Sequence, residues 1–141
     1  MTYWKVLGLS SVMFGLIACQ TVVSQNNTDV TSLAVIGTVA YTERISLPAN
    51  AKVTVSLVDK KRLGDAAILS QVSFPTGGKQ IPFNFSLPYS KAQILPNSDI
   101  VVKSDITLEN QPMFTTTTDY QVITNEIVDV NVKLTRVALT Q

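Results

Sequence analysis

Apolar and polar residues alternate along much of the chain after residue 33. In the segment AKVTVSL at residues 51–57, every second side chain is apolar, and the same period recurs at residues 81–87, 100–108 and 128–134. A period of two is typical of β-strands, because successive side chains point to opposite faces of a sheet. These four segments therefore predict strands with one buried face.

Three further segments predict strands through less regular patterns. Residues 33–43 are apolar on both faces, as expected of a central strand, and residues 66–74 fit either a strand or a short helix. Residues 112–122 contain four consecutive threonines, which are β-branched and favour strands. Pro82 cannot donate to a strand ladder, so it predicts that its strand lies at an edge or carries a bulge.

Turn-forming residues separate these segments. Residues 48–50 and 60–65 predict loops, whereas residues 76–78 and 109–111 predict tight hairpins. The longest connection, residues 88–98, is expected to cross between sheets. About seven short strands at this spacing predict an all-β domain built as an antiparallel β-sandwich. An up-and-down barrel is the alternative.

The first residues have a different pattern. Lys5 is followed by an apolar run over residues 6–18, which is shorter than the ~20 residues that span a bilayer as a helix but matches the core of a signal peptide. The run ends in Leu16, Ile17, Ala18 and Cys19, which resembles the lipobox of bacterial lipoproteins. The resemblance implies signal cleavage between Ala18 and Cys19, with lipid on the Cys19 thiol and an acyl chain such as palmitate on the new amino terminus. A buried structural cysteine and a transmembrane anchor are the alternatives.

Gln20 follows the expected lipidation site. In Gram-negative lipoproteins an Asp at this place usually signals retention in the inner membrane, so Gln20 implies sorting to the outer membrane. The polar residues 21–32 bury too little apolar surface to offset their ordering entropy, and they predict a flexible tether. The expected organisation is a signal peptide at residues 1–18, a lipidated cysteine and tether at residues 19–32, and one domain at residues 33–141.

Composition narrows the chemistry of this domain. The chain has 11 basic and 10 acidic residues, no histidine and one cysteine. Without histidine and with its thiol lipidated, the mature chain has no set of residues for a Cys/His metal site or a histidine-activated nucleophile. The near-neutral charge is not typical of a nucleic-acid-binding domain. No metal, cofactor or nucleic acid is expected, and the scattered carboxylates do not predict an enzyme.

Three motifs carry a family resemblance. They are GTVAYTERISLPANAKVTVSLVD at residues 37–59, IPFNFSLPY at residues 81–89 and FTTTTDYQV at residues 114–122. Together they resemble the YbaY/YscW-type family of small bacterial lipoproteins. The resemblance implies a compact β-sandwich on a lipid anchor, without a cofactor. One branch of the family contains pilotins, which escort secretin subunits to the outer membrane, and the other contains general envelope lipoproteins, which these motifs resemble more.

Three residues are candidates for an interaction site. Glu43 and Arg44 follow the first predicted strand, where they form either a polar recognition point or an ion pair that orients the turn. Tyr89 is a candidate for a ligand groove together with Tyr41 and Tyr120. In a sandwich, tyrosines more often pack their rings inside and bond their hydroxyls at corners, and this is the alternative.

The expected function is that of a non-enzymatic binding or structural lipoprotein. It is anchored to the outer membrane by its N-terminal lipid, faces the periplasm and contacts another outer-membrane or periplasmic protein. Addition of a partner strand is the expected mode, at the strand near Pro82 or at residues 115–118. The alternatives are a pilotin-like chaperone that escorts a secretion-system subunit, and an enzyme of envelope polysaccharide metabolism.

Overall fold

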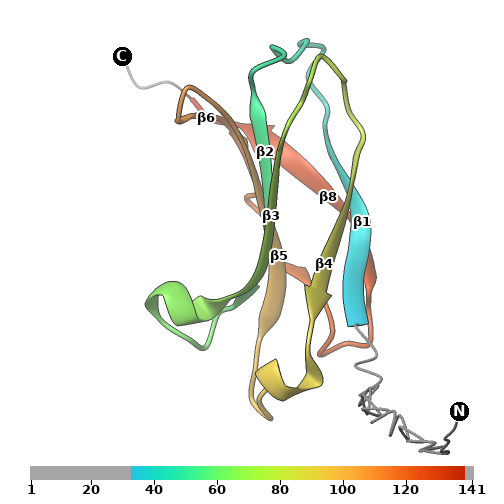
Figure 1. The fold of residues 1–141 in the computed structure, drawn as a ribbon, viewed down its shortest axis with the longest axis vertical. Helices are drawn as coiled ribbons and strands as arrows, with labels where there is room; N and C mark the ends of the chain where they lie inside the picture. Colours follow the sequence, from blue (N-terminus) through green and yellow to red (C-terminus); the bar gives the residue numbers. More distant parts are fainter. Residues whose placement is uncertain (1–32, 139–141) are drawn as a thin grey trace, which may run out of the picture. The chain divides into compact units, whose positions relative to one another are not determined.

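The computed structural model describes residues 33–138, which form an all-β domain (Figure 1). The expected signal peptide and tether, with Ala18, Cys19 and Gln20, lie outside the described residues, as do residues 139–141. Among the described residues, no helix is long and apolar enough to cross a membrane. The strands are β1 (Leu33–Tyr41), β2 (Lys52–Asp59), β3 (Ile68–Pro75), β4 (Phe83–Tyr89), β5 (Ile100–Leu108), β6 (Gln111–Thr115), β7 (Tyr120–Gln121) and β8 (Asp129–Arg136), and two 3₁₀ helices are η1 (Gly64–Ala67) and η2 (Lys91–Gln93).

The strands form one hydrogen-bonded path in the order β3-β2-β5-β6-β8-β1-β4, with the short β7 paired to β5. Pairing of β6 with β8 joins the two halves of the sheet, so the path curves into a nearly closed, barrel-like sheet. The two separate sheets of a sandwich are therefore not confirmed. The expectation of purely antiparallel strands is wrong at one place, because β1 and β8 run parallel.

The two ends of the path, β3 and β4, meet without pairing. β3 is bonded to β2 and β4 to β1, and no described strand pair joins β3 to β4. Figure 1 shows both strands running from the same turn. We call the line between their free edges the seam. The edge position expected from Pro82 is confirmed, since β4 begins at the next residue.

The turn at residues 76–78 is present, but the hairpin expected there is wrong. Gly77 and Gly78 have φ angles of 59° and 79°, a conformation that costs glycine little. The strands that this turn connects bond to different partners, β2 and β1, so the turn links the two ends of the sheet. The other predicted hairpin is confirmed, because β5 and β6 pair around Glu109 and Asn110, which have φ angles of 49° and 65°.

The strand expected at residues 112–122 is interrupted. β6 ends at Thr115 and β7 covers only two residues, while Asp119 between them pairs with Lys60 and Lys103. Thr115 ends β6, which lies between β5 and β8, and residues 116–118 belong to no strand, so residues 115–118 do not offer the free edge expected of them. Residues 66–74, which fit either a strand or a helix, contain both, because η1 runs directly into β3.

The core contains most of the apolar residues that the period of two predicted, although Val128, expected on the buried face, is 44% exposed because it lies before β8 begins. Val53, Val55 and Leu57 of β2 are fully buried, as is Leu87 of β4. Ser104 interrupts the apolar row of β5 but is also buried, and its hydroxyl donates a hydrogen bond of 2.9 Å to the Thr54 carbonyl. This bond satisfies the hydroxyl, which allows a polar side chain in the core.

Candidate functional site

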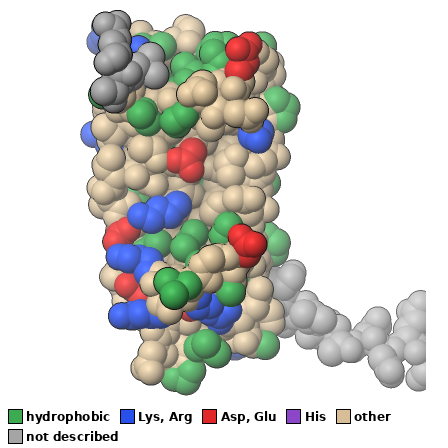
Figure 2. Space-filling model, turned by 90° about the vertical axis from the view of Figure 1, so that its left-hand side faces the viewer, with side chains coloured by type: hydrophobic (Ala, Val, Ile, Leu, Met, Phe, Trp, Pro, Cys, Tyr) green, Lys and Arg blue, Asp and Glu red, His purple; other side chains and the backbone are tan. Residues whose placement is uncertain are grey.

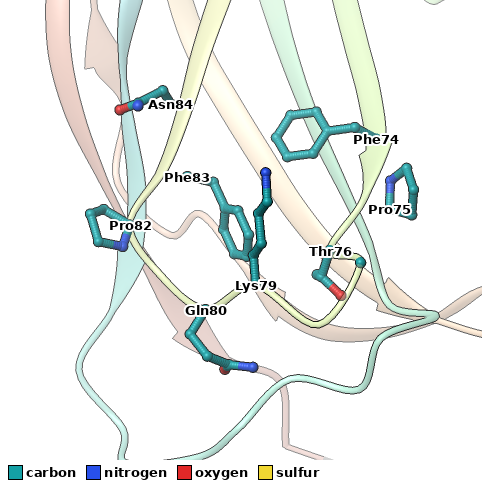
Figure 3. A pocket seen from close by; sticks show the side chains of 9 residues that line it. Phe74, Pro75, Thr76, Lys79, Gln80, Pro82, Phe83 and Asn84 are labelled. Carbon is teal, nitrogen blue, oxygen red and sulfur yellow. The ribbon is translucent and has the colours of Figure 1, made fainter.

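The largest feature at the seam is a cavity of about 490 Å³ at its turn end (Figure 3). Its walls come from the end of β3, the turn and the start of β4. Phe74 and Phe83 lie on opposite sides, with ring centroids 6.1 Å apart, and the Lys79 side chain extends from the turn toward the space between them. The lining residues are Phe74, Pro75, Thr76, Gly77, Lys79, Gln80, Pro82, Phe83 and Asn84.

Two side chains of this turn, Thr76 and Gln80, hold it in place. The Thr76 side chain is 2% exposed, its hydroxyl donates to the Pro48 carbonyl at 2.6 Å, and its amide donates to the Ala51 carbonyl at 2.8 Å. The Gln80 amide group accepts from the Leu47 amide at 2.9 Å and donates to the Leu47 carbonyl at 3.2 Å. These hydrogen bonds attach the turn, which forms one wall of the cavity, to the connection between β1 and β2.

A second cavity of about 330 Å³ adjoins the first through Gln80, which lines both. It is lined by Tyr41, Glu43, Arg44, Ile45, Ser46, Gln80 and Ile81. The structure thus brings two of the predicted site residues, Glu43 and Arg44, to the end of the seam. Among the described residues no ion pair joins Glu43 to Arg44, so the orienting ion pair is not formed.

Tyr41 positions Glu43. Its ring stacks on Phe114 with centroids 4.2 Å apart, and its hydroxyl donates to the Ile45 carbonyl at 2.6 Å. This bond spans the residues that carry Glu43 and fixes their path. Burial of the phenol, together with the nearby Glu43 charge, raises the pKa of Tyr41. Tyr41 therefore has the structural role expected of corner tyrosines.

Tyr89, the third predicted site residue, lies elsewhere. It is paired in register with Leu33 at the start of β1, whereas Glu43 follows the end of β1. A nine-residue strand is about 27 Å long, so Tyr89 does not belong to the same site. Tyr120 has a structural role, because its hydroxyl bonds both the amide and the carbonyl of Lys133, at 2.8 and 3.2 Å.

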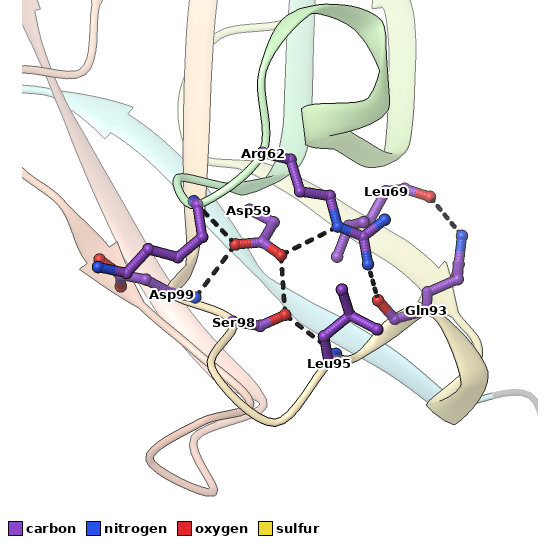
Figure 4. A network of polar contacts seen from close by, with 8 residues as sticks. Asp59, Arg62, Leu69, Gln93, Leu95, Ser98 and Asp99 are labelled. Carbon is purple, nitrogen blue, oxygen red and sulfur yellow. Dashed lines mark hydrogen bonds and ion pairs between the residues drawn. The ribbon is translucent and has the colours of Figure 1, made fainter.

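The sequence pattern did not predict a buried polar network around Asp59, which is 1% exposed (Figure 4). Its carboxylate accepts hydrogen bonds from the Ser98 hydroxyl at 2.8 Å and from the amides of Lys61 and Asp99 at 3.0 and 3.1 Å. The Nε of Arg62 lies 3.2 Å from the same carboxylate. The network joins the β2–β3 loop to the β4–β5 connection. The sequence signal that could have indicated this network is Asp59, an acidic residue at the end of a predicted strand, followed directly by the basic residues 60–62.

These contacts control the ionisation of Asp59. Burial raises its pKa, but the hydrogen bonds from Ser98, Lys61 and Asp99 and the charge of Arg62 together outweigh burial, and the pKa lies below its ordinary value. The Arg62 guanidinium also donates to the Gln93 carbonyl, and the Gln93 amide donates to the Leu69 carbonyl of β3 at 3.2 Å. Gln93 thereby closes the end of the seam opposite the cavities.

Two basic residues of the β2–β3 loop, Lys60 and Arg62, are paired with acids. Lys60 and Lys103 both pair with Asp119, whose pKa their hydrogen bonds and charges lower to about 2. Figure 2 shows basic, acidic and hydrophobic side chains interleaved on the lower part of one face. Within residues 33–138, no group of three or more acidic residues, histidines or cysteines has the spacing to hold a metal ion.

The fold defines a small all-β domain with an open seam between the two end strands of its sheet. A model of the type III secretion system lipoprotein chaperones (YscW) matches residues 30–134, and the chain belongs to this family. An uncharacterized lipoprotein of Escherichia coli (strain K12), YbaY, is 38% identical over 89 residues, which are 62% of this chain. The matched segment spans 46% of that relative, less than half of its length.

A solved structure extends the likeness to the fold. It is that of an alternative pilotin from the type II secretion system of Vibrio cholerae, with 36% identity and a TM-score of 0.69. The similarity covers 75% of this chain and 97% of the pilotin chain. The resemblance inferred from the three sequence motifs is therefore confirmed, and both names within it are represented among the relatives.

Proposed function

We propose that this protein is a lipid-anchored chaperone of the bacterial envelope, of the pilotin class. It binds a segment of an outer-membrane or periplasmic client protein at the seam between β3 and β4, and its lipid carries the complex to the outer membrane. Its role is binding and delivery, not catalysis. The observation that supports this most is the pair of unpaired strand edges that meet at a cavity with two aromatic side chains in its walls.

The seam suits an extended client segment. Each free edge has backbone groups that can bond an added strand, and alternate side chains of that strand would reach Phe74 and Phe83. The family and the pilotin relative both concern secretion systems, which supports an outer-membrane secretion subunit as the client. A general envelope role without a secretion client is the second candidate, supported by the likeness to YbaY.

The anchor is proposed at Cys19, with signal cleavage after Ala18 and outer-membrane sorting favoured by Gln20. Cys19→Ala is expected to leave uncleaved precursor that carries no lipid. Metabolic labelling with an alkyne fatty acid, followed by fractionation, tests this. Normal processing and outer-membrane fractionation of the variant would show that the anchor is elsewhere.

Site-specific photo-crosslinking in cells tests client binding. A photoreactive residue at Lys79 or Asn84, both exposed on the cavity wall, is expected to capture a single envelope protein. Asn125, exposed in the loop before β8 and absent from the cavity lining, is the control position and should capture none. Equal capture at all three positions would argue against the seam as the binding site, and a captured protein outside secretion systems would favour the second candidate.

A further inference from the structure

One carboxylate beside the seam lacks a partner. Glu43 Oε2 is buried and accepts no hydrogen bond from any described residue, although Glu43 is only half-buried as a whole. The neighbouring Arg44 is exposed and forms no ion pair with it. A buried carboxylate oxygen without a donor costs free energy, so its presence needs a reason.

The surroundings of Glu43 are built to hold it in this state. The Tyr41 hydroxyl fixes the backbone on both sides of it through the Ile45 carbonyl, and Gln80 fixes the opposite wall through Leu47. The side chains of Tyr41 and Gln80 both hydrogen-bond the backbone, and neither donates to Glu43. The smaller cavity thus holds the Glu43 carboxylate, a hydrogen-bond acceptor, next to the larger cavity between Phe74 and Phe83.

We propose that Glu43 is the specificity residue of the client site and pairs with an arginine or lysine side chain of the bound segment. This inference rests on the proposed binding of a client at the seam. An extended segment that places apolar side chains against Phe74 and Phe83 passes the turn that carries Gln80, where the adjoining cavity begins. A cationic side chain entering that cavity supplies the donors that the carboxylate lacks, in charge-assisted hydrogen bonds.

The rim of the site also carries two exposed cations, Arg44 and Lys79. These two cations repel a basic segment at the open surface. Any preference for a cationic side chain must therefore come from the Glu43 carboxylate. This makes Arg44 a matched control for Glu43, since the two are adjacent in the chain, line one cavity and carry opposite charges.

The probe is a set of short synthetic peptides with alternating valine, phenylalanine and threonine, in which a single arginine is moved from position to position. Each peptide has a twin in which citrulline, a neutral isostere, replaces arginine. Binding of the lipidated full-length protein in detergent is measured by fluorescence anisotropy. The best arginine peptide is expected to bind roughly 10- to 100-fold more tightly than its twin, as a charge-assisted bond to a buried acceptor implies.

Glu43→Gln is expected to reduce this ratio to about one. Arg44→Gln should raise the ratio, because a repelling charge is removed, and the remote Glu126→Gln should leave it unchanged. Glu43→Gln should also leave the thermal midpoint of the free protein unchanged or raise it, because a neutral amide is less costly to bury than an unpaired carboxylate. A purely structural glutamate would instead lower the midpoint on substitution.

Three results would overturn the inference: equal binding of arginine and citrulline peptides, selectivity retained in Glu43→Gln, or a lowered midpoint in that variant. Binding by no peptide counts against it as well. The proposed function has a separate readout, because seam crosslinks to a client in cells do not depend on the charge of the client. Crosslinks without selectivity for arginine would therefore refute only the role of Glu43.

Discussion

At the scale of single residues, the strands on both sides of Gly37 leave no space for a side chain at this position. It lies in β1 between Phe85 of β4 and Val130 of β8. A Cβ at this position would stand 1.9 Å from the Val130 carbonyl oxygen and 3.0 Å from the Phe85 ring. Only a residue without a side chain allows the parallel strand to approach this closely.

Gly37→Ala is therefore expected to lower the free energy of unfolding by about 3 kcal/mol, because the β1 and β8 backbones must separate. Urea denaturation measures the loss. Gly64→Ala is the control, since Gly64 has a positive φ but open space around its Cα, and it should cost only about 1 kcal/mol. Equal losses in the two variants would mean that the Val130 carbonyl moves aside at little cost and that this contact does not require glycine.

Asp59 determines a pH dependence. Because its folded pKa is lowered, its contribution to stability is complete above the unfolded pKa of about 4 and is lost as the pH falls through the folded value. Asp59→Asn should lower the free energy of unfolding at pH 7 by about 3 kcal/mol, since Arg62 then loses its buried partner.

The difference between Asp59→Asn and the unsubstituted protein should shrink below pH 4, and urea denaturation at pH 7 and pH 3 checks this. Asp119→Asn is the control, because Asp119 is exposed and screened by solvent, and it should have little effect at pH 7. A difference for Asp59→Asn that stays constant with pH would exclude the carboxylate charge as its source.

At the scale of elements, the β5–β6 hairpin is specified locally, whereas the β3–β4 turn is not. Glu109 and Asn110 both have positive φ, the arrangement of a two-residue turn that matches strand twist. Turn residues can thus be recognised in sequence. Whether the flanking strands then pair depends on whether their edges are already bonded elsewhere, as those of β3 and β4 are to β2 and β1.

The double substitution Glu109→Asn with Asn110→Gly should stabilise the protein by about 1 kcal/mol, because these residues adopt positive φ with less strain. The thermal midpoint should rise accordingly. Asn50→Gly, at a turn position without positive φ, should lower the midpoint slightly through the greater entropy of the unfolded chain. An unchanged midpoint for the double variant would mean that the hairpin is held by packing alone.

At the scale of the whole molecule, the barrel-like sheet is open along one line. β1, β2 and β5 are each bonded on both sides, whereas β3 and β4 have one neighbour each. An edge strand has half of its amides directed away from its neighbour, and these lack a ladder bond. The sheet is therefore hydrogen-bonded throughout except at the outer edges of β3 and β4, whose backbone groups are available to an added strand.

Hydrogen exchange should reflect this. Alternate amides of β3 and β4 are expected to exchange much faster than those of β1 and β5, and the client should slow the fast amides on binding. Exchange measured by NMR resolves the alternation. Uniform protection along β3 and β4 in the free protein would mean that the seam is closed by bonds between the two strands.

The sequence by itself determined the local features: the presence of β2 and β4 to within two residues, the hairpin at Glu109 and Asn110, and the family. Periodicity and turn chemistry are local properties, so they can be read without knowing the neighbours. Only the tertiary structure decided the strand order, the parallel pairing of β1 with β8, and the seam. Backbone hydrogen bonds are the same for every partner strand, so the pattern of side chains tells which face is buried but not which edges meet. For the same reason, the position of Glu43 beside Gln80 became visible only in the fold.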